Sequence, residues 1–273
     1  MDAKAYIDKQ GFKQLLNFYE TSEESLMNDY DLVIHLRTAA LGKEEFYTLE
    51  NNSARTETAE EARQKDIQTL NCWLGHRNLK IIGNETGFDE KIDKVLSEIY
   101  YLVDKPSPTQ KQFKYLVNNV YLNELNNLSQ INKFEIEQYV EVLEDKELIY
   151  RKTKGESEES YKIIKKLDTK IDNERITTQT ILTESGYYFW IPQNEAKPIK
   201  KTRYCFEYLN EYYKLDLFDD GLVILEVEET NKSKDISIPP FIKVSKDITF
   251  DKQYRNSSIY KRLNSKEKVK QLV

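Results

Sequence analysis

The chain has 273 residues, of which 39% are hydrophobic and 32% are charged, and it contains 19 Tyr and 11 Phe. This length suits one large domain or two ordinary ones, and the aromatic content is sufficient for packed cores, which excludes wholesale disorder. The net charge of −6 argues against bulk electrostatic binding of nucleic acid, so we expect no DNA partner.

Histidine and cysteine are scarce. His35 and His76 are the only histidines, which excludes a histidine-rich metal centre. Cys72 and Cys205 are too far apart for a metal-binding spacing and indicate a reducing compartment. Because no apolar run approaches a membrane span and no signal-peptide core is present, we expect an intracellular, cytoplasmic protein without a transmembrane segment. Assembly into a large organellar or ciliary complex stays open.

Residues 1–105 have the pattern of an α/β domain. Residues 32–36 and 79–82 are apolar on both faces, which predicts parallel strands. Residues 58–61 read T-A-E-E, a capping box that begins a helix extending to Gly75. From residue 88 to residue 99, apolar residues recur at helical spacing and predict an amphipathic helix.

A linker is predicted at 106–109, where Pro106 and Pro108 interrupt any helix. It would separate the first domain from a second domain at 110–264, followed by a tail at 265–273. Beyond the linker the hydrophobic period changes to two, which indicates strands.

Charged residues alternate along these strands. Lys201 and Arg203 share one face of a strand, Lys214 and Asp216 share a face of the next, and so do the two glutamates at 226 and 228. Such charges can face water over an amphipathic sheet. They can also line a closed barrel that holds a polyanion and its metal. Periodicity alone leaves both interpretations open.

The order of the motifs favours the barrel. Residues 199–204 read I-K-K-T-R-Y, 213–218 read Y-K-L-D-L-F, and 221–228 read G-L-V-I-L-E-V-E. A proline bend, I-P-P-F, follows at 238–241, and D-I-T and Y-R-N stand at 247–249 and 254–256. In this order the motifs resemble those of the CYTH, or triphosphate tunnel metalloenzyme, superfamily, which includes class IV adenylate cyclases, thiamine triphosphatases and inorganic triphosphatases. The resemblance implies an antiparallel β-barrel over 110–264, and hence an α+β fold overall.

The opening strand of the family departs from its usual pattern here. Residues 110–117 read Q-K-Q-F-K-Y-L-V and resemble E-x-E-x-K-F-L-V. Lys114 is kept, whereas Gln110 and Gln112 replace both catalytic carboxylates. In a rival assignment, Glu135 and Glu137 are the two glutamates of E-x-E-x-K. The lysine of that motif would then be Tyr139, and too few strands would remain for a closed barrel.

Further family positions are also altered. By resemblance, Tyr150 replaces an arginine of the R-x-R strand, Thr178 and Thr180 replace two acids, and Lys214 replaces a glutamate. The phosphate-binding set implied by the resemblance is Lys114, Lys152, Lys165, Lys201 and Arg203. Three carboxylates remain that could hold Mg²⁺ or Mn²⁺ weakly: Asp216, Glu226 and Glu228.

The N-terminal half resembles the C-terminal part of a P-loop NTPase (AAA-like) domain that precedes CYTH in a group of two-domain proteins. Segments 30–36, 45–55 and 73–76 carry this resemblance. No G-x-x-x-x-G-K-[ST] occurs, and the Walker A and Walker B segments would lie before Met1. Arg55 and Arg63 stand where lid arginines would be, but without a phosphate loop they are read as surface cations. We expect a protein partner to cover this truncated domain, unless Met1 is an internal start.

In an intact tunnel, cations grip the triphosphate while carboxylates hold a metal that polarises the phosphoryl group and activates water. Replacing two carboxylates by glutamine should preserve anion binding and weaken hydrolysis. The sequence therefore favours a pseudoenzyme that binds a nucleotide, polyphosphate or phosphoinositide. Two alternatives remain: a Mg²⁺- or Mn²⁺-dependent triphosphatase, and a structural or assembly subunit that reuses the enzyme fold.

Overall fold

The computed structural model describes residues 1–47, 57–103, 112–144, 146–156, 158–168, 175–192, 195–228 and 236–265, without the side chains of Arg175 and Glu228. The predicted linker at 106–109 lies outside these residues, as do Gln110, Arg55 and most of the predicted tail.

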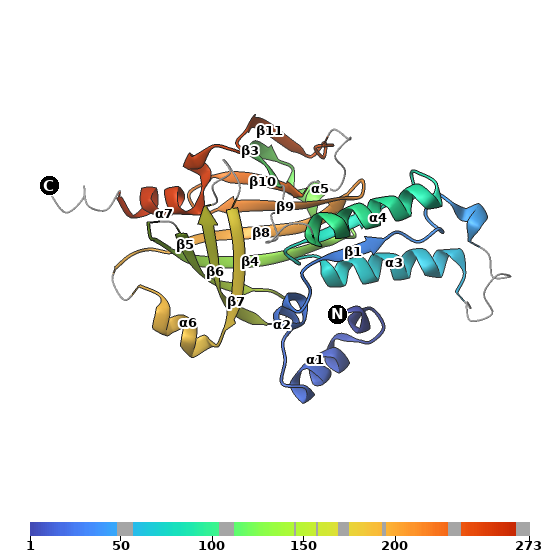
Figure 1. Ribbon diagram of the computed structural model, residues 1–273, viewed down its shortest axis with the longest axis horizontal. Coiled ribbons are helices and arrows are strands. Elements are labelled where there is room, and N and C mark those ends of the chain that lie inside the picture. Colours follow the sequence, from blue (N-terminus) through green and yellow to red (C-terminus); the bar gives the residue numbers. More distant parts are fainter. Residues whose placement is uncertain are drawn as a thin grey trace.

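Among the described residues, a nine-stranded antiparallel sheet is the largest unit, in the spatial order β11-β3-β10-β9-β8-β4-β5-β6-β7. Figure 1 shows how the sheet curls, with β6 and β7 crossing in front of β4 and β8. The strands are β3 (Gln112–Val120), β4 (Ile131–Val142), β5 (Lys146–Lys154), β6 (Glu159–Asp168), β7 (Arg175–Leu182), β8 (Ile199–Tyr208), β9 (Glu211–Phe218), β10 (Val223–Glu228) and β11 (Ile242–Asp247).

The sheet does not close into the predicted barrel. Within the described residues, β7 and β11 are its two edges and do not pair with each other. Side chains of other elements contact the β6–β7 region instead. Gln179 of β7 donates a hydrogen bond to Asn28 of α2 (Glu23–Asn28), and Arg255 lies 3.6 Å from Asp168 at the end of β6. The molecule is therefore mixed α and β, with a curled open sheet.

The N-terminal half contains a two-stranded parallel sheet, as predicted, in which β1 (Val33–Leu36) pairs with β2 (Leu79–Ile82). The helix α3 (Ala59–Trp73) begins with the predicted capping box, because Thr58 Oγ1 accepts from the Glu61 amide at 3.2 Å and Glu61 accepts from the Thr58 amide at 2.7 Å. The other elements of this half are η1 (Asp2–Ala5), α1 (Lys9–Phe18), η2 (Glu44–Phe46) and α4 (Phe88–Val103). None of the described helices is long and apolar enough to cross a membrane.

One hydrophobic cluster joins the two halves. Leu70, Trp73 and Leu79 of the N-terminal half pack together with Cys205 of β8 and Tyr212 of β9. The two predicted domains thus share a buried core, and the N-terminal half lies against one end of the large sheet.

Two further clusters surround the sheet. On its convex side, β3, β8, β9 and β10 pack around Phe206, Tyr213 and Phe241, beside the short helix α5 (Leu122–Asn126). At the far end of the concave side, Ile149, Ile164, Ile199, Phe218 and Ile224 of the strands pack with Ile248 and with Ile259 of α7 (Asn256–Ser265). This last cluster closes one end of the concave side with apolar side chains. The short η3 (Lys252–Tyr254) precedes α7.

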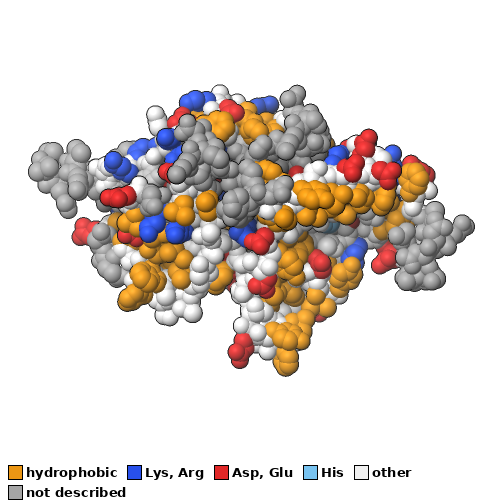
Figure 2. Space-filling view, viewed as in Figure 1, with side chains coloured by type: hydrophobic (Ala, Val, Ile, Leu, Met, Phe, Trp, Pro, Cys, Tyr) orange, Lys and Arg blue, Asp and Glu red, His pale blue; other side chains and the backbone are white. Residues whose placement is uncertain are grey.

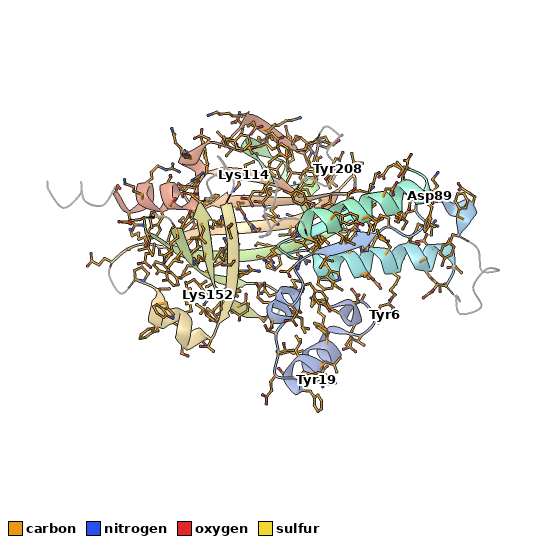
Figure 3. All side chains as sticks on the ribbon, viewed as in Figure 1. Tyr6, Tyr19, Asp89, Lys114, Lys152 and Tyr208 are labelled. Carbon is orange, nitrogen blue, oxygen red and sulfur yellow. The ribbon has the colours of Figure 1, made fainter. Side chains whose placement is uncertain are left out.

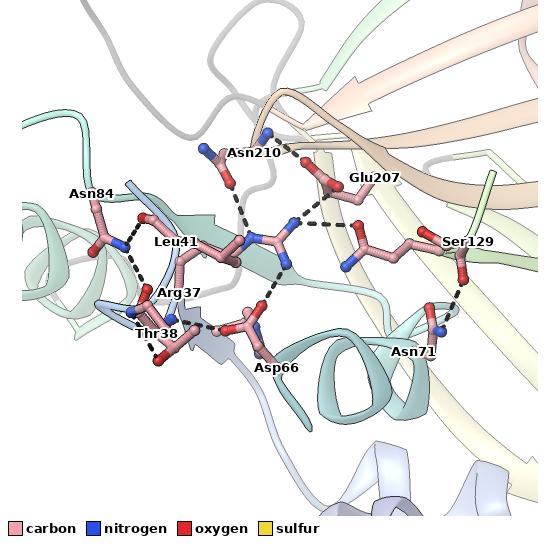
Figure 4. A network of polar contacts seen from close by, with 12 residues as sticks. Arg37, Thr38, Leu41, Asp66, Asn71, Asn84, Ser129, Glu207 and Asn210 are labelled. Carbon is pink, nitrogen blue, oxygen red and sulfur yellow. Dashed lines mark hydrogen bonds and ion pairs between the residues drawn. The ribbon is translucent and has the colours of Figure 1, made fainter. Parts of the chain in front are cut away.

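A buried arginine also fastens the two halves together (Figure 4). Arg37, just after β1, places Nη1 2.7 Å from Asp66 Oδ2 and Nη2 2.9 Å from Glu207 Oε2. Its Nε donates to Asn210 Oδ1 at 3.0 Å. Glu207 and Asn210 belong to the β8–β9 hairpin, so one guanidinium group pairs with carboxylates from both halves.

We expect Arg37→Ala to lower the free energy of unfolding by about 3–5 kcal/mol, because it leaves two buried carboxylates without their cation. Urea unfolding followed by tyrosine and tryptophan fluorescence measures this. Arg63→Ala is the matched control, since Arg63 makes a more exposed pair with Glu60 at 3.0 Å, worth about 0–1 kcal/mol. Equal losses in the two variants would contradict a central role for Arg37.

Candidate functional site

The concave side of the sheet encloses a cavity of about 160 Å³. This is room for roughly ten water-sized positions. Its lining comes from strands β3 to β10 and from the N-terminal half. Two glutamates line it, Glu24 and Glu226, against eight basic residues: Arg77, Lys114, Arg151, Lys162, Lys166, Lys201, Arg203 and Lys214. The described lining therefore carries an excess of positive charge.

The most buried part of this region is an ion-pair cluster around Asp216, which is 1% exposed. Lys201 Nζ lies 2.6 Å from Asp216 Oδ2. Arg203 binds the same carboxylate in a bidentate manner, with Nε 2.6 Å from Oδ1 and Nη2 2.6 Å from Oδ2. The three residues face one another because Arg203 is directly opposite Asp216 in the β8–β9 register and Lys201 is two residues away on the same face.

The cluster extends across β10 to β3. Arg203 Nη2 is 3.2 Å from Glu226 Oε2, and Lys114 Nζ is 2.7 Å from Glu226 Oε1. Glu226 and Lys114 are direct partners in the β10–β3 register. Two carboxylates are thereby bound by three cations.

Burial and pairing act in opposite directions on these groups. Burial raises the pKa of both carboxyl groups, but the Arg203 cation beside Asp216, and Lys114 and Arg203 beside Glu226, outweigh it and hold both pKa values below the ordinary range. Burial lowers the pKa of Lys201 to about 8 although Asp216 opposes the change. Both carboxylates are therefore anionic at neutral pH.

Arg151 of β5 differs from these cations in its partner. Its Nε and Nη2 donate to the neutral amide oxygen of Gln138 at 3.1 and 2.9 Å. Burial, and then repulsion from Arg203, lowers the pKa of this guanidinium. Because its hydrogen bonds go to an uncharged acceptor, Arg151 is a cation that an incoming anion would stabilise.

Several residues singled out from the sequence do converge on this cavity. Lys114, Lys201, Arg203 and Glu226 line it together with Gln112 and Lys214, and Asp216 lies directly behind Lys201 and Arg203. The backbone of Glu228 is opposite Gln112 in the β10–β3 register.

Other predicted positions lie on the opposite face of the sheet. Lys152 pairs with Glu159 at 2.8 Å, and Figure 3 shows it on the side of α6 (Glu184–Trp190), apart from Lys114. Tyr150 packs there with Tyr161 and Tyr187 in an aromatic cluster. The remaining residues on this face are Lys165, which is opposite Leu148 and Thr178, the exposed Thr178 and Thr180, and the rival pair Glu135 and Glu137.

The prediction for these residues is wrong because it assigns the cavity face of each strand to residues on the other face. In β5 the residue that faces the cavity is Arg151, not Tyr150 or Lys152. In β6, Lys162 and Lys166 face it in place of Lys165. In β7, Thr177 and Gln179 face it in place of Thr178. A shift of one residue exchanges the two faces of a strand, and cations occur on both faces here. The Gly155 turn pairs Lys154 with Glu159 and so places Arg151 opposite Lys162, which shows from the sequence that these two cations share a face but not that this face is the concave one.

The described residues show no site for the expected divalent metal. Asp216 and Glu226, the two described members of the predicted metal set, already bind three cations at 2.6–3.2 Å. No group of three or more His, Cys, Asp or Glu suited to a metal occurs in the part of the chain that the structure describes. Lys114 and Arg203 supply the positive charge around these carboxylates.

No protein-family model matches the chain, and no curated protein matches it either. Among solved structures, the chain is similar to the inorganic triphosphatase NE1496, with 19% identity and a TM-score of 0.40 over 56% of this chain and 94% of that chain. It is also similar to the PH1819 protein from Pyrococcus horikoshii OT3, with 13% identity and a TM-score of 0.35 over 45% of this chain and 79% of that chain. A third similar structure is the PH1012 protein from the same organism, with 15% identity and a TM-score of 0.33 over 45% of this chain and 80% of that chain.

The depressed pKa of Glu226 and of Asp216 predicts acid sensitivity. Both pKa values are lower in the folded state than in the unfolded state, so their stabilisation is complete above about pH 4.5 and is lost as the pH falls further. We expect Glu226→Gln to be less stable than the native protein at pH 7 and to lose less stability on acidification. Urea unfolding at several pH values tests this, with the exposed Asp89→Asn as control. An unchanged acid dependence in Glu226→Gln would contradict the assignment.

Proposed function

We propose that this chain binds a small phosphate-containing polyanion in the cavity of the large sheet, without a divalent metal and with little or no hydrolysis. The observation that carries the proposal is the excess of cations facing one cavity, where the hydrogen bonds of Arg151 to described residues go to a neutral amide. A buried cation is costly unless an anion or strong acceptor compensates it, and a multiply charged phosphate would compensate several at once.

The arrangement of the sequence motifs supports a CYTH-like origin for this cavity. The I-x-K-x-R-Y strand contributes Lys201 and Arg203, and the G-L-x-x-x-E-x-E strand contributes Glu226, all facing the same space. The lone lysine kept from E-x-E-x-K, Lys114, faces it too. A polyphosphate chain, or the phosphate end of a nucleotide or phosphoinositide, matches the charge and the volume of the cavity.

The absence of turnover follows from the same contacts. Metal-assisted phosphoryl transfer needs carboxylates that are available to the ion. Here both described carboxylates of the predicted metal set are held by cations, and Gln112 stands where the resembling family has a glutamate. An intracellular setting is part of the proposal and is supported by the two buried free cysteines, Cys72 and Cys205.

A second candidate function, a subunit of a larger assembly, is favoured by α4. This helix has no buried residue, and six of its large apolar side chains are exposed. Figure 2 shows them as a row of hydrophobic atoms along α4. The row, which we call the α4 stripe, consists of Phe88, Ile92, Leu96, Ile99, Tyr100 and Val103. We propose that a protein partner with an apolar face covers this stripe.

For the binding function, we expect Arg151→Met to weaken tripolyphosphate binding about 10- to 100-fold, the loss expected for one charge-assisted interaction. Isothermal titration calorimetry in the presence of EDTA measures the affinity. Lys152→Met is the matched control, since it removes the neighbouring charge from the opposite face, and its affinity should stay within about twofold of the native value.

Two outcomes would contradict the binding proposal. One is equal loss of affinity in the two variants, which would indicate binding outside the cavity. The other is rapid phosphate release from tripolyphosphate on addition of Mg²⁺ or Mn²⁺, which would favour the triphosphatase alternative.

For the assembly function, the uncovered α4 stripe should make the isolated chain self-associate with rising concentration. Sedimentation velocity measures this, and we expect the double variant Ile92→Lys/Leu96→Lys to reduce the association. A native chain that stays monomeric at all accessible concentrations would count against α4 as a docking surface.

A further inference from the structure

One carboxylate in the cavity comes from the N-terminal half of the chain. Glu24 of α2 lines the cavity, and its carboxylate forms an ion pair with Lys162 of β6. The two side chains are only 18% and 13% exposed. Of the described residues that line the cavity, Glu24 is the only acidic one outside the large sheet.

The surroundings keep Glu24 anionic. Burial raises the pKa of its carboxyl group, but the ammonium of Lys162 and, more weakly, the guanidinium of Arg151 together hold it below the ordinary value. Glu24 therefore supplies negative charge to the two cations that face the cavity from β5 and β6. Among the described residues, this carboxylate is the hydrogen-bond acceptor for the Lys162 ammonium.

The helix that carries Glu24 is also a wall between two spaces. Glu24 and Met27 line the inner cavity, and both also line a second cavity of about 350 Å³. On the sheet side, Phe134 and Thr153 line both spaces as well. Displacement of α2 would therefore join the inner cavity to the outer one.

Several polar contacts hold α2 in place, together with Met27, which packs against the cluster around Trp73 and Tyr212. None of its residues is buried. Its contacts include Glu23 with Lys4 at 2.7 Å, the Glu24 amide with Glu158 at 3.3 Å, and Asn28 with Gln179 of β7. A segment without buried apolar side chains opens at a lower free-energy cost than the core of a protein.

We propose that Glu24 is an internal substitute for a phosphoryl group of the ligand, and that a polyanion entering the cavity displaces it from Lys162 and releases α2. This inference rests on the proposed binding function and adds an autoinhibitory gate to it. The resting chain is thus closed by its own carboxylate, and a ligand must carry enough negative charge to replace Glu24 at Lys162 and reach Arg151 at the same time. A monoanion that offers no more charge than Glu24 gains little by the exchange.

The deciding variant is Glu24→Gln, which removes the charge and keeps the shape. We expect it to bind tripolyphosphate more tightly than the native chain, on the order of tenfold, because the ligand no longer displaces a competing charge pair. Glu23→Gln is the matched control: it removes an equal charge from the adjacent residue of α2, whose partner Lys4 is outside the cavity lining. Its affinity should rise far less than that of Glu24→Gln, because the change loosens α2 without freeing a cation that lines the cavity. Calorimetry of the full chain in EDTA compares all three.

Hydrogen exchange of the native chain gives a second measurement that needs no variant. Saturating tripolyphosphate should speed exchange of the amides at 22–29 while slowing exchange in β5 and β6. If the native chain binds tripolyphosphate but Glu24→Gln binds no more tightly, or α2 keeps its exchange rates, the gate is refuted and the binding function stands. If neither the native chain nor Glu24→Gln binds tripolyphosphate or pyrophosphate, both proposals fail.

Discussion

The paired carboxylate of Asp216 is the constraint on which the inner face of this sheet depends. A charge that is 1% exposed is tolerated only with partners, and Lys201 and Arg203 provide them from the neighbouring strand. Once Arg203 is fixed in this way, its second contact holds Glu226, which in turn positions Lys114. The cation-rich interior is therefore a connected network across four strands, and its carboxylates are held by protein cations.

This network leaves the cavity with unequal numbers of positive and negative groups. The guanidinium of Arg151 donates hydrogen bonds to the amide oxygen of Gln138, which offsets part of the cost of its burial. The ammonium of Lys162 pairs with the carboxylate of Glu24, from the N-terminal half of the chain. Both solutions keep the cations solvated by protein groups in the resting state. They also leave the cations available to a ligand that offers a denser negative charge. Because the carboxylate on Lys162 belongs to Glu24 of α2, such a ligand would act on the position of α2.

The contribution of Glu24 depends on how the N-terminal half is fastened. Arg37 binds Asp66 on one side and Glu207 on the other, and the cluster around Trp73 and Tyr212 adds buried apolar surface. The N-terminal half therefore packs against the sheet through α3, β1 and β2. The helix α2 has no buried residue, so it can be displaced at a lower free-energy cost than α3, β1 and β2.

The amino-acid sequence by itself determined the parallel β1–β2 pair, the capped helix α3, the change to strands after residue 110, and the face of one strand that Lys201 and Arg203 share. These features are local, so periodicity and spacing suffice to predict them. Only the tertiary structure decided that the sheet stays open, that Arg151 faces the cavity while Lys152 does not, and that Glu24 enters it. The physical reason is that strand register and contacts between distant segments depend on pairing across the whole sheet, and a shift of one residue reverses every side chain.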